Sequence, residues 1–129
     1  STNVIPTEYL NKAKSAANPD DRDSYVKNGI TAMRTCYEIL IIKEVLRDTV
    51  KRFTDRLSIE RFKEIVLPIE LRDEVYNAYG LLCRYMEGHS HSDEYGSHIP
   101  PTIEILKREI DSYDALKSKI KNARKVKVS

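Results

Sequence analysis

Apolar residues recur at helical spacing along most of this chain of 129 residues, and that period limits the fold more than any other feature of the sequence. No run alternates apolar and polar residues over the length of a strand. From Asp20 or Asp21 to about Phe53, two apolar stripes follow one another. The first consists of Val26, Ile30, Met33, Tyr37 and Leu40, and the second of Ile39, Ile42, Leu46, Val50 and Phe53. Because the stripes overlap at residues 39–42, we expect that stretch to be the most buried part of the core.

Capping and helix-breaking residues mark two short helices. Thr7 is a suitable N-cap for a helix that ends at Asn18, before a proline. Ser58 is a suitable N-cap for a second one, which Pro68 stops.

Two further amphipathic helices occupy the second half of the chain. One begins at Ile69 and ends near Gly88, and the other begins near Thr102. Their apolar positions are Leu71, Val75, Ala78, Tyr79, Leu82, Tyr85 and Met86 in the first, and Ile103, Leu106, Ile110, Tyr113, Leu116 and Ile120 in the second. We therefore predict an all-α fold, an up-and-down bundle of four main helices plus short helices, in a single domain of residues 1–129.

Composition narrows the class of protein further. Charged residues make up 33% of the chain and apolar residues 40%, with four Gly and five Pro, which excludes collagen-like and linker classes. The longest strongly apolar run, residues 39–42, is far short of the roughly 18 residues of a membrane-spanning helix. Cys36 and Cys83 lie in helical patterns and are predicted to be buried thiols in a reducing cytoplasm rather than a disulfide. No leader is visible, so we expect a cytoplasmic protein without a membrane partner.

Titratable residues gather between the two last helices. Seven lie within fifteen positions: Arg84, Glu87, His89, His91, Asp93, Glu94 and His98. They include every histidine of the chain, in a segment rich in turn residues.

A helical wheel places Arg84 on the polar face of its helix, together with Asn77 and Gly80 and opposite the face that points to the core. A glycine inside a helix costs about 1 kcal/mol relative to alanine, and its missing side chain lets another backbone approach. We therefore predict that a second helix, from another subunit, packs on Asn77, Gly80 and Arg84.

The segment from Arg84 to His89 resembles the R-x4-6-H motif of HEPN domains, small helical bundles of bacterial and archaeal defence and toxin systems, and His91 matches the motif at its upper spacing. Residues 34–120 are also similar to the helical C-terminal part of defence-associated AAA-family ATPases, including anticodon-nuclease-like ones. The similar segments are 34–38, 50–53, 83–91 and 101–104. No phosphate-binding loop is present, so this chain is not itself such an ATPase.

This resemblance implies a metal-independent endoribonuclease without a cofactor, active as a homodimer in a defence or toxin setting such as defence against phage. His89 or His91, with an ordinary pKa near ~6.5, would take the proton from an RNA 2′-OH. Arg84 would hold the negative charge that grows on the phosphate. Glu87 would orient a histidine or pair with Arg84.

Other interpretations remain open. The chain is alternatively a non-catalytic HEPN-like interaction module, either part of a larger defence ATPase or a partner of an ATPase or antitoxin. A third interpretation is a metal-binding helical protein, with ligands from His89, His91, His98 and Asp93. Arg84 and Glu87 would also suit an ordinary helix-surface pair, three residues apart.

The last stretch of the chain, the basic tail of residues 117–129, carries six cations and no acid, whereas the rest sums to −4. Such a tail would bind RNA phosphates by releasing counterions, or would simply favour the end of a solvated helix. The predicted RNA-binding residues are Lys117, Lys119, Lys121, Arg124 and Lys125.

Overall fold

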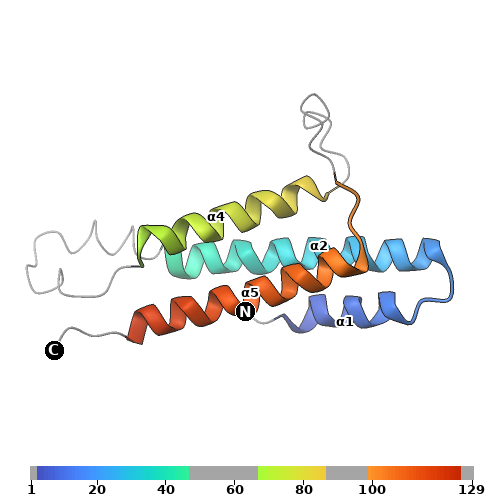
Figure 1. Ribbon diagram of the computed structural model, residues 1–129, viewed down its shortest axis with the longest axis horizontal. Helices are drawn as coiled ribbons and strands as arrows, with labels where there is room; N and C mark the ends of the chain where they lie inside the picture. The colour runs from blue at the N-terminus through green and yellow to red at the C-terminus, as the bar shows by residue number, and fades with distance from the viewer. Residues whose placement is uncertain (1–2, 47–66, 87–98, 126–129) are drawn as a thin grey trace, which may run out of the picture.

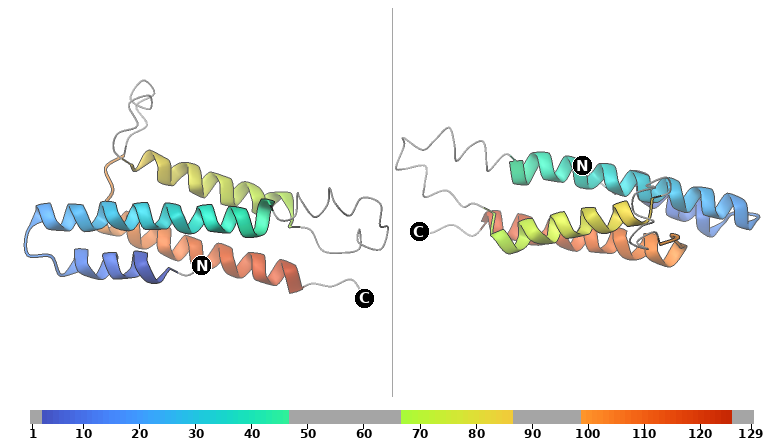
Figure 2. Two further views of the ribbon diagram at one scale, coloured as in Figure 1. Left: turned by 180° about the vertical axis from the view of Figure 1, so that it is seen from behind. Right: turned by 90° about the horizontal axis from the view of Figure 1, so that it is seen from above.

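The computed structural model describes residues 3–46, 67–86 and 99–125, and in these ranges the chain is an all-α bundle without strands. Its helices are α1 (Val4–Lys14), α2 (Pro19–Leu40), α4 (Ile69–Arg84) and α5 (Ile103–Lys125), and a short π-helix, η1 (Ile41–Leu46), continues α2. Successive helices run in opposite directions, which confirms the predicted up-and-down arrangement (Figures 1 and 2).

The α2/α5 pair is the centre of the bundle. These two helices contact each other and both of the remaining ones, while α1 and α4 lie on opposite sides of the pair (Figure 2). Gly29 of α2 faces Leu106 of α5, and a Cβ built on Gly29 would lie only 2.5 Å from a Leu106 methyl carbon. The missing side chain therefore allows the two central helices to approach closely.

Helix α1 begins earlier than the predicted cap at Thr7. Its first residue is Val4, and the Thr7 amide donates to the Asn3 carbonyl at 2.9 Å. Pro6 lies inside this first turn, where amides have no partner within the helix, so the missing proline N–H costs nothing. The helix also ends earlier than predicted, at Lys14.

Helices α2 and α5 begin with side-chain caps. The Asn18 side chain accepts from the Asp21 amide at 2.8 Å, so α2 begins at Pro19 rather than at Asp20 or Asp21. The Thr102 hydroxyl accepts from the Ile105 amide at 3.1 Å, which agrees with the predicted start of the last helix.

The core is built from the predicted stripes of three helices. All five residues of the first stripe of α2 are buried. Five of the six predicted apolar positions of α5 are buried as well, namely Leu106, Ile110, Tyr113, Leu116 and Ile120. Helix α4 contributes fully buried Val75 and Leu82. The rings of Tyr37 and Tyr113 meet edge to face, with centroids 5.1 Å apart.

The expectation for residues 39–42 is wrong in part. Leu40 is buried, but Ile39 is 36% exposed, Ile42 is 61% exposed, and Leu46 of the same stripe is also exposed. The described helices cover only the side of α2 that carries Leu40, and the wide turns of η1 change the direction of the residues that follow. Val50 and Phe53 lie outside the described residues, as does the predicted helix after Ser58.

Both cysteines are free thiols, as predicted, but Cys83 is only half-buried, so the predicted burial is wrong for that residue. Cys36 is buried, and this burial raises the pKa of its thiol. Within the described residues, no helix is long and apolar enough to cross a bilayer.

Candidate functional site

The outer face of α4 is open. Asn77, Gly80 and Arg84 are all exposed, and a Cβ built on Gly80 would meet no atom within 4 Å. No described helix of this chain therefore makes the close approach that the glycine suggested. Packing of a second subunit on Asn77, Gly80 and Arg84 stays a prediction.

Arg84 is the last residue of α4, and the described part of the chain continues for two more residues before the histidine-bearing segment begins. The chain turns at once, because the Tyr85 amide donates to the Leu82 carbonyl at 3.1 Å and the Met86 amide to the Cys83 carbonyl at 3.3 Å. The Ile99 amide then donates to the Arg84 carbonyl at 3.0 Å. The described residues on either side of positions 87–98 therefore lie next to each other at Arg84.

The other predicted catalytic residues lie outside the described residues. These are Glu87, His89 and His91, together with Asp93 and His98 of the metal-binding alternative. Because α4 ends at Arg84, an unbroken helix does not carry His91 back to the face of Arg84. The choice between His89 and His91 therefore stays open.

A second guanidinium, which sequence reasoning did not assign to the site, lies near the end of α4. Arg34 of α2 donates from Nε to the Tyr79 hydroxyl at 3.2 Å and from a terminal nitrogen to the Met86 sulfur at 3.3 Å. The Tyr79 hydroxyl donates to Glu38 at 2.9 Å, and Arg34 also pairs with Glu38 at 3.4 Å. The hydrogen bond to Tyr79 is the main reason why the pKa of Arg34 is raised.

This cluster positions a half-buried cation beside the start of the histidine-bearing segment. The Arg34 side chain is 31% exposed, so this cation is only partly withdrawn from solvent. The sequence pattern that could have indicated this cluster is the pair of Arg34 and Glu38, which lie four residues apart on one helix. The structure buries Cys36 and Tyr37 between them.

A second polar cluster fixes the position of Tyr85, the residue that follows Arg84. The Tyr85 side chain is buried, and its hydroxyl accepts from Arg108 of α5 at 2.6 Å. Arg108 also pairs at 3.5 Å with Glu109, a carboxylate that is 3% exposed. Burial raises the pKa of Glu109, while Arg108 opposes the shift. The α4 terminus is therefore anchored to α5 by a hydrogen bond as well as by packing.

The basic tail is not a uniform cationic surface. Lys119 pairs with Glu74 of α4 at 3.0 Å, and Arg124 pairs with Glu44 at 3.1 Å while donating to the Glu44 carbonyl at 3.0 Å. Two of the five predicted RNA-binding residues therefore take part in contacts within the bundle. Lys121 and Lys125 are exposed, and Lys117 is half-buried.

Within the described residues, no group of three or more histidine, cysteine, aspartate or glutamate side chains is arranged to hold a metal ion. The histidines of the metal-binding interpretation lie outside them. Comparison of the chain with models of protein families, with curated proteins and with solved structures gave no match. The class that the fold defines is an all-α helical bundle.

Proposed function

We propose that this protein is a HEPN-like, metal-independent endoribonuclease that acts as a homodimer, with Arg84 and either His89 or His91 as catalytic residues. The observation that carries the proposal is the hydrogen bond between the Ile99 amide and the Arg84 carbonyl. It brings Ile99, the residue after the last histidine, to Arg84, the residue that begins the R-x4-6-H motif. Arg84 itself is exposed, as a residue that binds a phosphate must be.

The proposed reaction is an attack of the RNA 2′-OH on the adjacent phosphorus. The histidine takes the 2′-OH proton, the new O–P bond closes a 2′,3′-cyclic phosphate, and the 5′-oxygen leaves with a proton from the surroundings. Arg84 binds the phosphate oxygens as their charge grows, and Arg34 supplies a second cation near the start of the same segment. Glu87 orients a histidine or pairs with Arg84. DNA is not cleaved, because it lacks the nucleophile.

Cleavage of a labelled single-stranded RNA in the presence of EDTA tests the proposal. We expect Arg84→Ala and one of the two variants His89→Ala and His91→Ala to lower the rate by about 100-fold or more. Arg22→Ala is the matched control, because Arg22 is an exposed arginine on another helix, and this variant should cleave like the wild type. An all-2′-deoxy strand should be resistant. A wild-type protein without activity, or an Arg84→Ala variant with full activity, would refute the proposal.

Light scattering tests the dimer. We expect a dimer at micromolar concentration and a monomer for Gly80→Arg, because the open surroundings of Gly80 accept a long side chain within one chain but not between two. A wild-type monomer, or a Gly80→Arg dimer, would contradict the proposed interface of Asn77, Gly80 and Arg84.

One observation favours the alternative of a non-catalytic interaction module. Ile39, Ile42 and Leu46 are exposed along the end of α2 and η1, and large exposed apolar side chains in a row are typical of protein-binding surfaces. If the protein lacks ribonuclease activity in every assay above, this alternative becomes the better account of the fold.

A further inference from the structure

Glu109 of α5 is a buried carboxylate that the proposed reaction does not use. It is 3% exposed, and within residues 3–46, 67–86 and 99–125 no other charged residue is buried. Moving a charge out of water lowers stability unless its partners compensate for the lost hydration. A single cation, Arg108, pairs with Glu109 in these ranges, at 3.5 Å. Its presence in the core therefore calls for a role other than stability.

Glu109 and Tyr85 together fix the orientation of the Arg108 side chain. The guanidinium pairs through Nε with Glu109 and donates from a terminal nitrogen to the Tyr85 hydroxyl at 2.6 Å. The Arg108 side chain is 59% exposed, so without these contacts it would rotate into solvent. Because a guanidinium is planar, a contact at one nitrogen sets the direction of the others. The carboxylate of Glu109 therefore directs the donor that binds Tyr85.

Tyr85 links this pair of contacts to Arg84. The Tyr85 side chain is buried, and the peptide unit between Arg84 and Tyr85 contains the carbonyl that accepts from the Ile99 amide at 3.0 Å. Because a peptide unit is planar, fixing Tyr85 also limits the rotation of that carbonyl. From α2, Arg34 donates to the Met86 sulfur at 3.3 Å. Arginines of both central helices thus hold the two residues that follow Arg84.

We propose that Glu109 is a positioning residue: through Arg108 and Tyr85 it holds the C-terminal end of α4, and with it Arg84, in place against α5. The consequence for RNA cleavage rests on the proposed function, in which Arg84 binds the phosphate. The consequence for the position of the α4 end does not. Residues that order a functional site commonly lower the stability of the fold that carries them.

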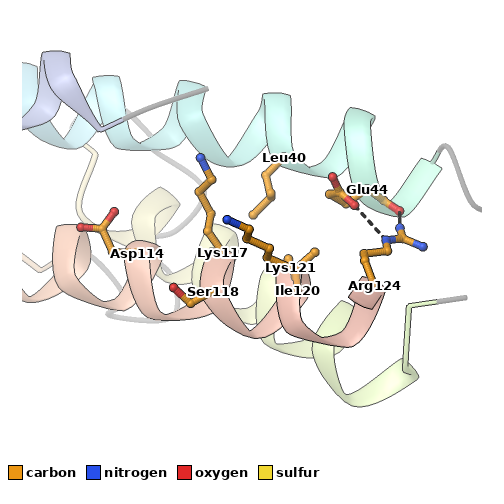
Figure 3. A pocket seen from close by; sticks show the side chains of 8 residues that line it. All are labelled: Leu40, Glu44, Asp114, Lys117, Ser118, Ile120, Lys121 and Arg124. Atoms are coloured by element: carbon orange, nitrogen blue, oxygen red, sulfur yellow. Dashed lines mark hydrogen bonds and ion pairs between the residues drawn. The ribbon is translucent and has the colours of Figure 1, made fainter. Parts of the chain in front are cut away.

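A similar pair near the other end of α5 offers a matched control. Arg124 pairs with Glu44 of η1 at 3.1 Å and donates to the Glu44 carbonyl at 3.0 Å (Figure 3). This pair lies about 22 Å from Glu109 along the helix. Glu44→Gln and Glu109→Gln remove the same charge from an arginine partner on the same helix, but only Glu109 is linked to Arg84.

Amide hydrogen exchange, measured by NMR on the full chain, tests the positioning without RNA. We expect the amides of Met86 and Ile99 to exchange about tenfold faster in Glu109→Gln, and also in Tyr85→Phe, which loses only the hydroxyl group. In Glu44→Gln they should exchange as in the wild type. The core amides of Glu109→Gln should exchange no faster than before, because the loss of a buried charge does not weaken the fold as a whole.

RNA cleavage tests the consequence for Arg84. We expect kcat to fall about tenfold in Glu109→Gln and in Tyr85→Phe, with little change in KM, because a displaced group impairs the reaction step. Glu44→Gln should keep the kcat of the wild type. The double variant should be no slower than the slower single variant, since both changes interrupt one series of contacts. Glu109→Gln is expected to be at least as stable as the wild type, so unfolding does not account for its loss of activity.

Three results would overturn the proposal. The first is wild-type exchange of the Ile99 amide in Glu109→Gln, and the second is an equal acceleration in Glu44→Gln, which would show a general loosening. The third is an active wild type whose Glu109→Gln variant exchanges faster but keeps full kcat, because Arg84 would then not depend on Glu109. If the wild type does not cleave RNA, the ribonuclease proposal fails, and the exchange rates alone decide whether Glu109 positions the end of α4.

Discussion

Two glycines in two helices give a matched test of how the bundle is packed. A methyl group added at Gly29 would lie 2.5, 3.0 and 3.3 Å from the two methyl carbons and the Cγ of Leu106, whose side chain is fully buried. A methyl group added at Gly80 would meet nothing within 4 Å. Both changes to alanine remove the same flexibility from a helix interior, so their difference isolates the contact with Leu106.

The magnitudes follow from these surroundings. Gly80→Ala should raise the free energy of unfolding by about 1 kcal/mol, the difference in helix propensity between glycine and alanine. Gly29→Ala should gain the same free energy from helix propensity, but overpacking the tight interior should cost about 1–3 kcal/mol of stability. We therefore expect the stability of Gly29→Ala to lie between that of the wild type and a value about 2 kcal/mol lower.

Urea unfolding followed by circular dichroism measures both values, at a protein concentration where each variant is monomeric. The urea midpoint should rise for Gly80→Ala and stay unchanged or fall for Gly29→Ala, while the dependence of the free energy on urea stays the same, because neither change alters the surface exposed on unfolding. Equal stabilisation by the two substitutions would show that Leu106 does not pack on Gly29. The close approach of α2 and α5 would then be refuted.

Two further substitutions test the buried polar groups. Burial raises the pKa of Glu109 in the folded protein, so the folded state holds this proton more tightly than the unfolded chain, and stability falls as the pH rises through the folded pKa. Glu109→Gln should therefore be more stable than the wild type at neutral pH, with the gain disappearing below the ordinary carboxyl pKa of about 4.3. If the gain in stability of Glu109→Gln is independent of pH, the burial of Glu109 is not its cause. The same follows if Glu104→Gln, at an exposed position, gains as much. The Tyr37 hydroxyl is buried without a hydrogen-bond partner in the described residues, so Tyr37→Phe should raise the free energy of unfolding by about 1 kcal/mol. A comparable loss in thermal or urea unfolding would show that the hydroxyl is satisfied.

The helices and the core were predictable because burial on one side of a helix leaves a periodic trace in the sequence. The stripe from Val26 to Leu40 is buried throughout. The exposure of Ile39 and Ile42 was not predictable in the same way, because it depends on which sides of α2 other helices cover.

The residues of the candidate site also differ in whether the sequence alone could predict their surroundings. The exposed position of Arg84 agrees with a helical wheel, since it depends only on the helix that carries it. The cluster of Arg34, Tyr79 and Glu38 depends on the register of α2 against α4, which no local pattern records. The burial of Glu109 likewise depends on the neighbours of α5, and the catalytic roles of His89 and His91 stay predictions.

The hydrogen bond between the Ile99 amide and the Arg84 carbonyl also fixes the positions of the described residues on either side of positions 87–98 next to each other. Doubling the length of the chain that joins two such fixed points costs only about 0.6 kcal/mol in closure entropy. Insertions, deletions or exchanges at positions 87–98 should therefore leave the packing of the four helices unchanged.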